Sequence, residues 1–600
     1  MNRVALLASL YLAALPPTGL RAEETADAIY TNGDILTMVD AQPIAEALAV
    51  RDGRILAVGG AADVLRIRGS KTRMVDLGGK TLLPGFIDPH SHFAQYEQSW
   101  GLPNLSPPPV GDVRCVADIV AKLKAHLAAK RLPPGALVMG FGYDDSLLAE
   151  KRHPTCADLD QVSTEHPVMV THASGHLIAA NSAALRLVGY SRETPDPPGG
   201  AIRRDADGEP SGVCEELAGL PFLALLQPNP LGNQLRNLVE IQDFYASLGI
   251  TTAQDGISMA QNIRLLREAA KRGMLFMDVV SYPRWDMFND VLAGARKLDV
   301  EYHPPMLGCC DVTGDGGRCA DMEHVVADAS KVQAGIYQNH FKIGGIKITA
   351  DGSPQGKTAF LTQPYVKPPQ GQPADYRGYP TATQDELDRW FDAAWRHDVQ
   401  LIVHCNGDAA ADMMIAAVRK AVANHGPKDL RPVMIHAQMI RHDQVDAMAE
   451  LGIVPSFFTA HTFYWGDWHV AETVGRDRAF GMSPAGYART KGLPFTNHSD
   501  APIVPPDPLM VLWTAVNRVS RSGAVVGPDE RIPPLAGLKA MTIDAARQYF
   551  EENSKGSLEP GKRADLVILD RNPLKVEPLA IKDIRVVETI KDGQTIYPRP

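Results

Sequence analysis

The chain has 600 residues, of which 45% are hydrophobic and 22% charged, and its formal net charge is -10. This length exceeds what one compact core usually contains, so at least two domains are expected. The composition is that of an ordinary globular protein, and the negative charge argues against nucleic-acid binding, which usually needs a basic face. Seven cysteines are too few for a disulfide scaffold. One bridge within the cluster of Cys309, Cys310 and Cys319 is an option, as is a chance Cys-Cys pair.

The first 22 residues have the order of a secretory signal peptide. Arg3 precedes an apolar run over residues 4–15, and a breaker-rich stretch over 16–22 ends in the small residue Ala22. The run is shorter than the roughly 20 apolar residues of a membrane span, which argues against stable membrane insertion. We therefore predict cleavage after residue 22 and export to a bacterial periplasm.

The two ends of the mature chain share one pattern of short strands and turns. Near the start, Asp52-Gly53 separates two apolar runs, which is typical of a β-hairpin. Similar runs return at 564–569 and 584–590. We predict that residues 23–80 and residues 541–600, the latter opening with a helix, form one small β-sandwich domain from both chain ends.

Between these ends, short apolar runs alternate with longer helical stretches. The runs lie at 137–140, 277–280, 343–348, 401–403, 433–435 and 494–496. Short buried strands separated by helices indicate parallel βα units, so we predict an α/β fold with a (β/α)8 TIM-like barrel over residues 81–540. The long, Pro-rich stretch from about 101 to 235 is interpreted as an insertion that shapes or covers the site.

The first candidate metal ligands are His90 and His92, which follow the apolar pair Leu82-Leu83 closely. Residues i and i+2 share one face of a strand, so both imidazoles can bind one ion. With 18 histidines in 600 residues, about half of one His-x-His is expected by chance, so the motif alone is weak. Its position at the end of an apolar strand strengthens it.

Four further residues share this strand-end position. Lys347 lies in the run around 343–348, and the others end or follow later runs: His404, His436 and Asp500. Each alone is as well explained by an ordinary buried polar group. Together they converge only if the strands close into a barrel, whose catalytic groups sit at the carboxyl ends of its strands.

The motifs in this order resemble the amidohydrolase superfamily, and within it the YtcJ-like group, amidohydrolase family 3. The resemblance spans nearly all of the mature chain. It rests on the segments at 83–92, 174–176 with 181–182, 199–200 with 208–212, 346–352, 497–500 and 556–567. Individually several of these motifs are loose, but their order is specific.

The resemblance implies a site for one or two metal ions, commonly Zn²⁺, with other divalent metals possible. His90 and His92 would bind the first ion with Asp500, and His404 and His436 the second. Lys347 would be carbamylated and bridge the two, because a carbamate is an anionic oxygen donor whereas an ammonium is a poor ligand. The alternative for Lys347 is an ion-paired or snorkelling lysine.

Several other polar residues are candidates for contact with substrate. They lie near predicted strand ends: His176, Asp351, His461, Trp465 and His498. An ordinary loop or packing role is about as well supported for each, and Asp351 can equally cap a turn.

The resulting hypothesis is a metal-dependent hydrolase that cleaves a C–N amide bond of an N-acyl or N-formyl small molecule. Metal-activated hydroxide would attack the carbonyl, and Asp500 would shuttle the proton to the leaving nitrogen. Hydrolysis of a lactone, ester or cyclic amide is the alternative reaction. A non-catalytic periplasmic binding protein is the alternative from another class. The sequence leaves a monomer and a homo-oligomer open.

Overall fold

The computed structural model describes residues 25–226, 229–287, 335–369 and 371–599. The predicted signal peptide and the cluster of Cys309, Cys310 and Cys319 lie outside these residues. In the described ranges, no helix is both long and apolar enough to cross a membrane.

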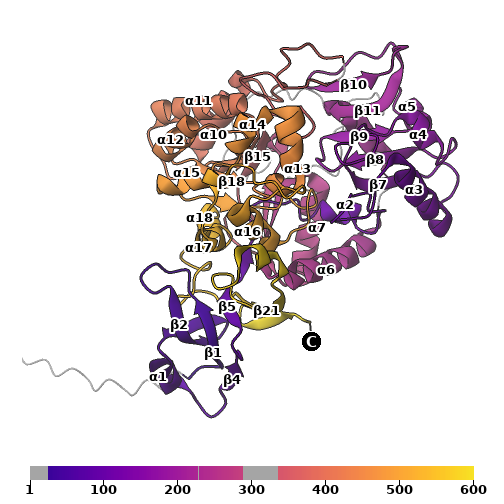
Figure 1. The fold of residues 1–600 in the computed structure, drawn as a ribbon. Helices are drawn as coiled ribbons and strands as arrows, with labels where there is room; N and C mark the ends of the chain where they lie inside the picture. The colour runs from indigo at the N-terminus through magenta and orange to yellow at the C-terminus, as the bar shows by residue number, and fades with distance from the viewer. Residues whose placement is uncertain (1–24, 227–228, 288–334, 370, 600) are drawn as a thin grey trace, which may run out of the picture.

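Both ends of the chain contribute to one sheet of eight strands at the base of the molecule (Figure 1). Its strands are β1 (Ala28–Leu36), β2 (Ile44–Arg51), β3 (Arg54–Gly59), β4 (Arg73–Asp76), β5 (Thr81–Pro84), β20 (Leu566–Leu569), β21 (Val586–Lys591) and β22 (Gln594–Tyr597). Antiparallel pairing of β5 with β20 joins the two ends of the chain. The strands form a single hydrogen-bonded sheet, so its division into the two layers of a sandwich stays a prediction.

The predicted hairpin at Asp52-Gly53 is present in this sheet. Arg51 pairs with Arg54 across the turn. Asp52 and Gly53 have φ values of 49° and 71°, the left-handed conformation of both central residues in a type I′ turn. An added Cβ at Gly53 would lie 2.7 Å from the Asp592 carbonyl oxygen, so glycine also lets the C-terminal segment pack against the turn.

Two parallel sheets form the centre of the large lobe. One has the order β14 (Phe341–Ile343), β13 (Asp278–Pro283), β12 (Ile250–Ser258), β6 (Phe86–Ile87). The other has the order β15 (Ile346–Thr349), β16 (Leu401–Cys405), β17 (Val433–His436), β18 (Val454–Phe457), β19 (Thr496–Asn497). Almost every residue of these strands is buried, as expected when helices or other layers cover both faces of a parallel sheet.

Backbone contacts join the two parallel sheets on both sides. A parallel bridge pairs Arg284, after β13, with Lys347 in β15. After β19 and β6, the Asp500 N–H donates to the His90 carbonyl (3.2 Å), and the His92 N–H donates to the Ala501 carbonyl (2.7 Å). Closure into a complete (β/α)8 barrel stays a prediction, but these bonds bring the predicted ligand segments together.

Helix α10 (Gln384–His397) illustrates why helices cover these strands. The Thr383 hydroxyl accepts the Glu386 N–H, and the Glu386 carboxylate accepts the Thr383 N–H (2.8 Å), which forms a capping box. Its buried face, with Leu387 and Trp395, packs in the core that also contains β15 and β16. Further helices outside the insertion, among the described residues, are α1 (Ala61–Val64), α2 (Tyr96–Ser99), α6 (Leu231–Ser247), α7 (Ala260–Lys271), α11 (Asp408–His425), α12 (His442–Leu451), α13 (His461–Trp468), α14 (Gly475–Phe480), α15 (Ala485–Thr490), α16 (Pro508–Asn517), α17 (Pro534–Ala540) and α18 (Ile543–Gln548).

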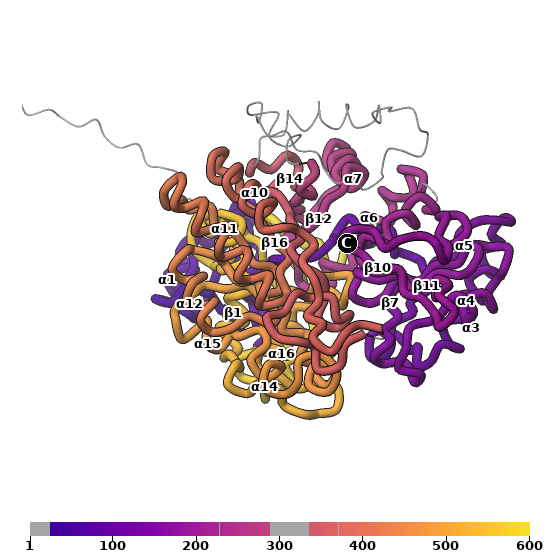
Figure 2. Tube along the Cα trace, turned by 90° about the horizontal axis from the view of Figure 1, so that it is seen from above, coloured from indigo at the N-terminus to yellow at the C-terminus, as the bar shows by residue number. Residues whose placement is uncertain are grey.

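The stretch predicted as an irregular insertion contains a regular five-stranded sheet. Its order is β10 (Gly200–Arg204), β11 (Pro210–Glu216), β9 (Leu177–Ala180), β8 (Val168–His172), β7 (Val138–Tyr143). Helices α3 (Val116–Lys130), α4 (Cys156–Asp160) and α5 (Ser182–Leu187) accompany it, and a 3₁₀ segment, η2 (Leu217–Leu225), follows. This insertion lobe lies beside the central helices in two views (Figures 1 and 2). The predicted strand run at 137–140 belongs to this sheet rather than to the central ones.

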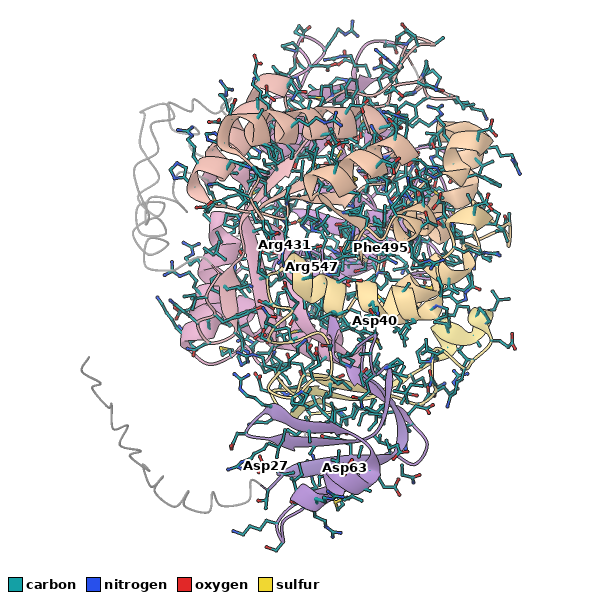
Figure 3. The ribbon with its side chains drawn as sticks, turned by 90° about the vertical axis from the view of Figure 1, so that its left-hand side faces the viewer. Asp27, Asp40, Asp63, Arg431, Phe495 and Arg547 are labelled. Carbon is teal, nitrogen blue, oxygen red and sulfur yellow. The ribbon has the colours of Figure 1, made fainter. Side chains whose placement is uncertain are left out.

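A buried cluster of charges connects the central strands to the small sheet, which Figure 3 shows below the lobe that carries Arg431 and Arg547. The Asp278 carboxylate, at the start of β13, accepts a hydrogen bond from the Lys591 ammonium (2.7 Å) and also forms an ion pair with Lys555. Lys591 binds Asp565 (2.7 Å) as well. Burial alone would raise the pKa of Asp278, but the two lysines hold it well below its usual range.

We expect Asp278→Ala to lower the free energy of unfolding by about 3–5 kcal/mol, because it leaves two buried ammonium groups without this partner. Urea unfolding followed by fluorescence measures the change. Asp243→Ala is the control, because the pair of Asp243 with Arg599 is solvent-exposed and should contribute about 0–1 kcal/mol. Equal effects of the two substitutions would contradict this.

The same cluster predicts a pH dependence. The folded-state pKa of Asp278 lies below the ordinary value of 3.8. Its stabilising contribution is therefore complete above that value and is lost as the pH falls through the lower folded pKa. The stability difference between the natural chain and Asp278→Ala should shrink over that acidic range.

Candidate metal centre

The six residues predicted as metal ligands lie together at the carboxyl ends of the central strands. His90 and His92 follow β6, and Asp500 follows β19. The remaining three lie within their strands: Lys347 in β15, His404 in β16 and His436 at the end of β17. The strand ends thus meet as the sequence predicted, although the positions in the strand differ.

His90, His92 and Asp500 form one compact group of candidate ligand atoms. Asp500 Oδ1 lies 3.4 Å from His90 Nε2 and 3.2 Å from His92 Nε2. The three ligand atoms all lie within 4.8 Å of one another. His90 is fully buried, so a charged partner in this position has little access to solvent.

The unpaired polar atoms of this group fit a cation. Asp500 Oδ1 and His92 Nδ1 are buried and have no hydrogen-bond partner among the described residues. A buried carboxylate oxygen without a partner is costly, and a divalent cation held by two imidazoles and a carboxylate would satisfy it. The donor set therefore fits a metal ion.

A second group of possible ligands, in the insertion lobe, has its atoms engaged already. Asp144 Oδ2 accepts the Trp465 indole N–H (2.6 Å), and His172 Nε2 lies 3.0 Å from Asp145 Oδ1. The other ring nitrogen of His172 bonds to the Ser174 hydroxyl (2.9 Å). These contacts describe a hydrogen-bond network that needs no ion.

Gln254 in β12 fixes the tautomer of His90. The Gln254 amide N–H groups donate to the Pro89 carbonyl (2.7 Å) and the Tyr549 hydroxyl (2.8 Å). Its Oε1 must therefore accept the N–H of His90 Nδ1, at 2.5 Å. The lone pair of His90 therefore lies on Nε2, the ring nitrogen that lies beside Asp500. Metal-binding histidines are commonly oriented in this way, by a hydrogen bond from the ring nitrogen that does not bind the metal.

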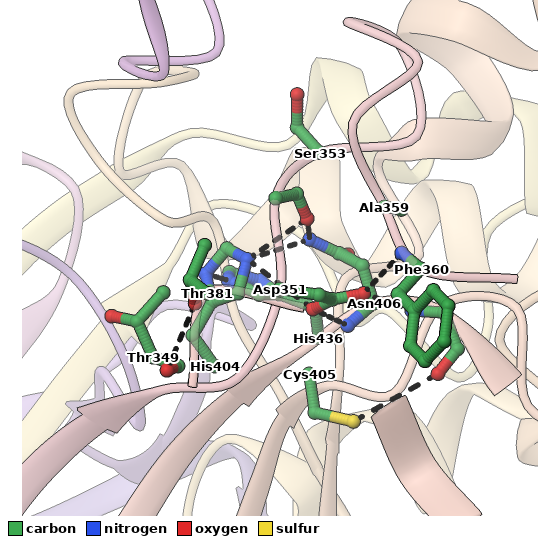
Figure 4. Close-up of polar contacts among 12 residues, drawn as sticks. Thr349, Asp351, Ser353, Ala359, Phe360, Thr381, His404, Cys405, Asn406 and His436 are labelled. Atoms are coloured by element: carbon green, nitrogen blue, oxygen red, sulfur yellow. Dashed lines mark hydrogen bonds and ion pairs between the residues drawn. The ribbon is translucent and has the colours of Figure 1, made fainter. Parts of the chain in front are cut away.

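His404 and His436 form a second imidazole pair. His404 Nε2 lies 3.1 Å from the Gly352 carbonyl oxygen and 3.0 Å from Asn406 Nδ2, while His404 Nδ1 lies 3.0 Å from His436 Nε2. His436 Nδ1 lies 3.1 Å from His498 Nε2. Figure 4 shows His404 and His436 beside the loop that contains Asp351.

Burial keeps these imidazoles in the neutral form that binds metals. The pKa values of His90, His404 and His436 all lie well below the usual range. Burial is the largest cause in each case, and neighbouring cationic groups add to it.

Lys347 lies in this cluster with only 2% of its surface exposed. Its Nζ is 3.1 Å from His90 Nε2, and burial lowers its pKa to about 7. In the described structure no carboxylate hydrogen-bonds to Nζ, so an ion-paired lysine is not what the geometry shows.

Two candidate ligands have a strained backbone. His436 has a φ of 73° and Asp500 a φ of 58°. Residues other than glycine seldom adopt positive φ values, and such backbone strain concentrates at functional sites.

A cavity of about 370 Å³ opens onto this cluster. His92, Lys347, His404, His436 and Asp500 form one part of its wall. Apolar side chains of the insertion lobe form another part: Met139, Phe141, Met169, Ile178, Leu220 and Phe222. The insertion thus helps to enclose the site, as the sequence predicted.

The family model described as "Amidohydrolase family" matches residues 73–597. The chain belongs to the amidohydrolase family. It is 26% identical over 581 residues to N-substituted formamide deformylase from Arthrobacter pascens, covering 96% of this chain and 98% of the relative. It is 27% identical over 592 residues to the putative amidohydrolase YtcJ from Bacillus subtilis (strain 168), covering 95% and 99%.

A solved structure shares the fold of this amidohydrolase. An uncharacterized metal-dependent hydrolase from Pyrococcus horikoshii OT3 superposes with a TM-score of 0.67 at 22% identity, covering 92% of this chain and 99% of that one. The family model and the full-length relatives confirm the predicted family and enzyme class: the chain is a metal-dependent hydrolase acting on C–N bonds.

The residues predicted to contact substrate lie in different surroundings. His176 lines the cavity. His461 Nδ1 pairs with His469 (3.0 Å), the Trp465 N–H with Asp144, and His498 Nδ1 with the Ser456 hydroxyl (2.9 Å). In the described part of the chain these last three side chains do not line the cavity.

Asp351 stabilises a loop of the amidohydrolase behind the cavity. Its carboxylate accepts three backbone N–H groups, from Asn406 (2.9 Å), Gly407 (2.8 Å) and Phe360 (3.0 Å) (Figure 4). Both oxygens are therefore occupied, which matches the turn-capping alternative weighed for this residue.

Sequence reasoning missed two residues that orient the site, Gln254 and Glu216. Gln254 lies at a central position of β12, whose mixed sequence of apolar and polar residues gives no hint of a partner for His90. Glu216 ends β11, directly after the motif at 208–212 that contributed to the family resemblance. That motif was the one available signal.

Proposed function

We propose that this amidohydrolase cleaves the C–N amide bond of an uncharged N-acyl or N-formyl small molecule, with Asp500 as the proton shuttle. The observation that carries the proposal is the buried, unpaired Asp500 Oδ1, held between His90 and His92 at the wall of the cavity. The name of the formamide deformylase relative is consistent with this class of reaction.

His90, His92 and Asp500 would hold one ion, and His404 and His436 a second, with Zn²⁺ the proposed metal. Lys347 would lie between them as a carbamate. A bound ion supplies an activated water near neutral pH and polarises the amide carbonyl. The separation of the five imidazole and carboxylate ligands into a group of three and a pair supports this division.

Asp500 would take the proton that the attacking water loses and return it to the leaving nitrogen, so the products are a carboxylic acid and an amine. Its second oxygen remains for hydrogen bonding while Oδ1 faces the histidines. A carboxylate at this position can both accept and donate the proton, which the neutral amide of an asparagine cannot do.

The cavity wall favours an uncharged substrate with an apolar substituent. Lys347 is the sole lysine or arginine among the described residues of the wall, and the proposed carbamate consumes its charge. The carboxylate of an N-acyl amino acid would therefore lack a cationic partner, which is costly in a partly buried site. The insertion side of the wall offers methionine, leucine and phenylalanine side chains instead.

Turnover of a substrate panel with added zinc tests this proposal. Neutral N-formyl amines with an apolar substituent should be hydrolysed fastest, N-acyl amino acids more slowly, and lactones or esters least. Faster turnover of lactones, esters or cyclic amides would favour the alternative reaction. No turnover despite stoichiometric metal and tight ligand binding would favour a binding protein.

We also infer that the two parallel sheets close into a (β/α)8 barrel. The backbone contacts on both sides of the sheets support this inference. Export to the periplasm is proposed from the sequence pattern of residues 1–22 alone.

A further inference from the structure

His176 presents an imidazole to the cavity from the insertion lobe. It precedes β9, lines the cavity, and has a side chain 19% exposed. Its ring centroid lies 4.9 Å from that of His404. The side chain is therefore next to the metal centre but comes from a different sheet.

Glu216 engages one nitrogen of this ring. Glu216 Oε2 lies 2.8 Å from His176 Nδ1, and because an ionised carboxylate only accepts, the proton lies on Nδ1. Within the described residues, Nε2 has no hydrogen-bond partner. It is thus the polar atom of the ring that remains for a ligand in the cavity, and in the neutral ring it is an acceptor.

The protein maintains this carboxylate in a strained position. Glu216 has φ 47° and ψ −121°, a combination that costs a residue other than glycine about 1–3 kcal/mol. By contrast His425 and Asp392 form a similar pair (2.6 Å) on the outer helices, and neither has a positive φ. This backbone conformation fixes where the Glu216 carboxylate lies beside the His176 ring.

Contacts with the loop after β15 and with His176 hold Glu216 in place. Its Oε1 accepts the Thr358 hydroxyl (2.9 Å), and its backbone N–H donates to the His176 carbonyl (2.8 Å). A Cβ added at Gly352 would lie 2.5 Å from Oε1, so this glycine leaves room for the carboxylate. The loop after β15, which carries Lys347, is thereby connected to the insertion lobe through Glu216.

We propose that the Glu216–His176 pair recognises the N–H of a secondary amide, with His176 Nε2 accepting that hydrogen and Glu216 acting as the positioning residue. This inference rests on the proposed amide hydrolysis and narrows its substrate to amides with one hydrogen on nitrogen. Esters, lactones and fully substituted amides lack this donor and would leave Nε2 unpaired. A site built to hydrogen-bond a substrate N–H discriminates against analogues that lack it.

The test compares two matched substrates, an N-alkylformamide and its N-methyl derivative. In the natural enzyme kcat/KM should favour the secondary amide by at least about 10-fold, the value of one hydrogen bond of about 1.4 kcal/mol. His176→Phe retains a ring and should reduce that preference several-fold, mainly by slowing the secondary amide. His425→Phe, at the outer pair, is the matched control and should leave the preference unchanged.

Glu216→Gln provides a second variant that retains the side-chain volume. A glutamine amide can donate to Nδ1, which would move the imidazole proton to Nε2 and turn the acceptor into a donor. The preference for the secondary amide should therefore fall in this variant as well, with metal content and thermal midpoint close to those of the natural enzyme.

Four outcomes would overturn the inference. Equal losses of kcat/KM on both substrates in His176→Phe would show that the ring does not bind the amide N–H. Loss of metal in this variant would make His176 a metal ligand instead. If no amide is hydrolysed, the proposed function fails separately, and dissociation constants of the same two amides decide the inference. An unchanged affinity ratio in His176→Phe, or binding of neither amide, would then reject it.

Discussion

Asp500→Asn is expected to lower kcat by about 100- to 10,000-fold, the usual contribution of a positioned acid–base group. The substitution retains the size and one oxygen of the side chain, so part of the metal content should survive. The amide cannot take up the proton released by the attacking water, and this is why turnover falls more than metal binding. Steady-state kinetics together with metal analysis of the purified protein measure both quantities.

Asp467→Asn is the matched control for this experiment. Asp467 lies beyond the metal centre and accepts the Ser520 hydroxyl (2.8 Å). Its replacement should leave kcat and metal content within about two-fold, since an exposed hydrogen bond contributes about 1 kcal/mol or less. Near-normal kinetics in Asp500→Asn would remove Asp500 from the proton transfer.

The sequence could predict that the candidate ligands lie together, because each lies in, ends or follows a short apolar run. Residues such as His404 and His436 stand in runs whose strand character is visible locally. Parallel strands of one barrel end at the same rim, so the position of each residue in its strand decides where its side chain lies. Neighbouring strands therefore bring the ligands together without any further information.

The residues that orient those ligands could not be predicted in this way. Gln254 is paired with His90 over 164 residues of sequence, and Glu216 with Thr358 over 142. Neither a glutamine in a strand nor a glutamate after a motif has a local sequence pattern that identifies its partner. Such pairs depend on how whole sheets pack, and one sequence contains no record of that packing.

The insertion lobe was underestimated for a related reason. β9 has four residues and β10 has five, and such short strands between prolines and glycines resemble loops. Their pairing across the sheet, in the order β10-β11-β9-β8-β7, stabilises what the local pattern does not. This sheet also positions His176, so the part of the fold least visible in the sequence is the part proposed to select the substrate.

Lys347→Ala is expected to remove most of the metal and the activity, with partial recovery when short carboxylic acids such as formate or propionate are added. Loss of an outer hydrogen bond to a ligand costs about 10- to 100-fold in metal affinity, so loss of a ligand should cost at least about 100-fold. Burial, which lowers the pKa of Lys347 to about 7, leaves an uncharged amine available near neutral pH. That amine can attack carbon dioxide, forming an N–C bond and releasing a proton, which gives the proposed carbamate.

Rescue separates this role from a structural one. The alanine variant leaves a space beside His90 Nε2, where Nζ lay at 3.1 Å, and a small carboxylate can supply the missing anionic oxygens there. Lys357→Ala is the control, since its ammonium lies over the Trp468 ring (5.0 Å to the centroid) rather than at the centre. It should retain metal and show no response to added acids. A lysine that only filled space would be replaced by methionine without loss, so an active, metal-replete Lys347→Met would exclude the carbamate.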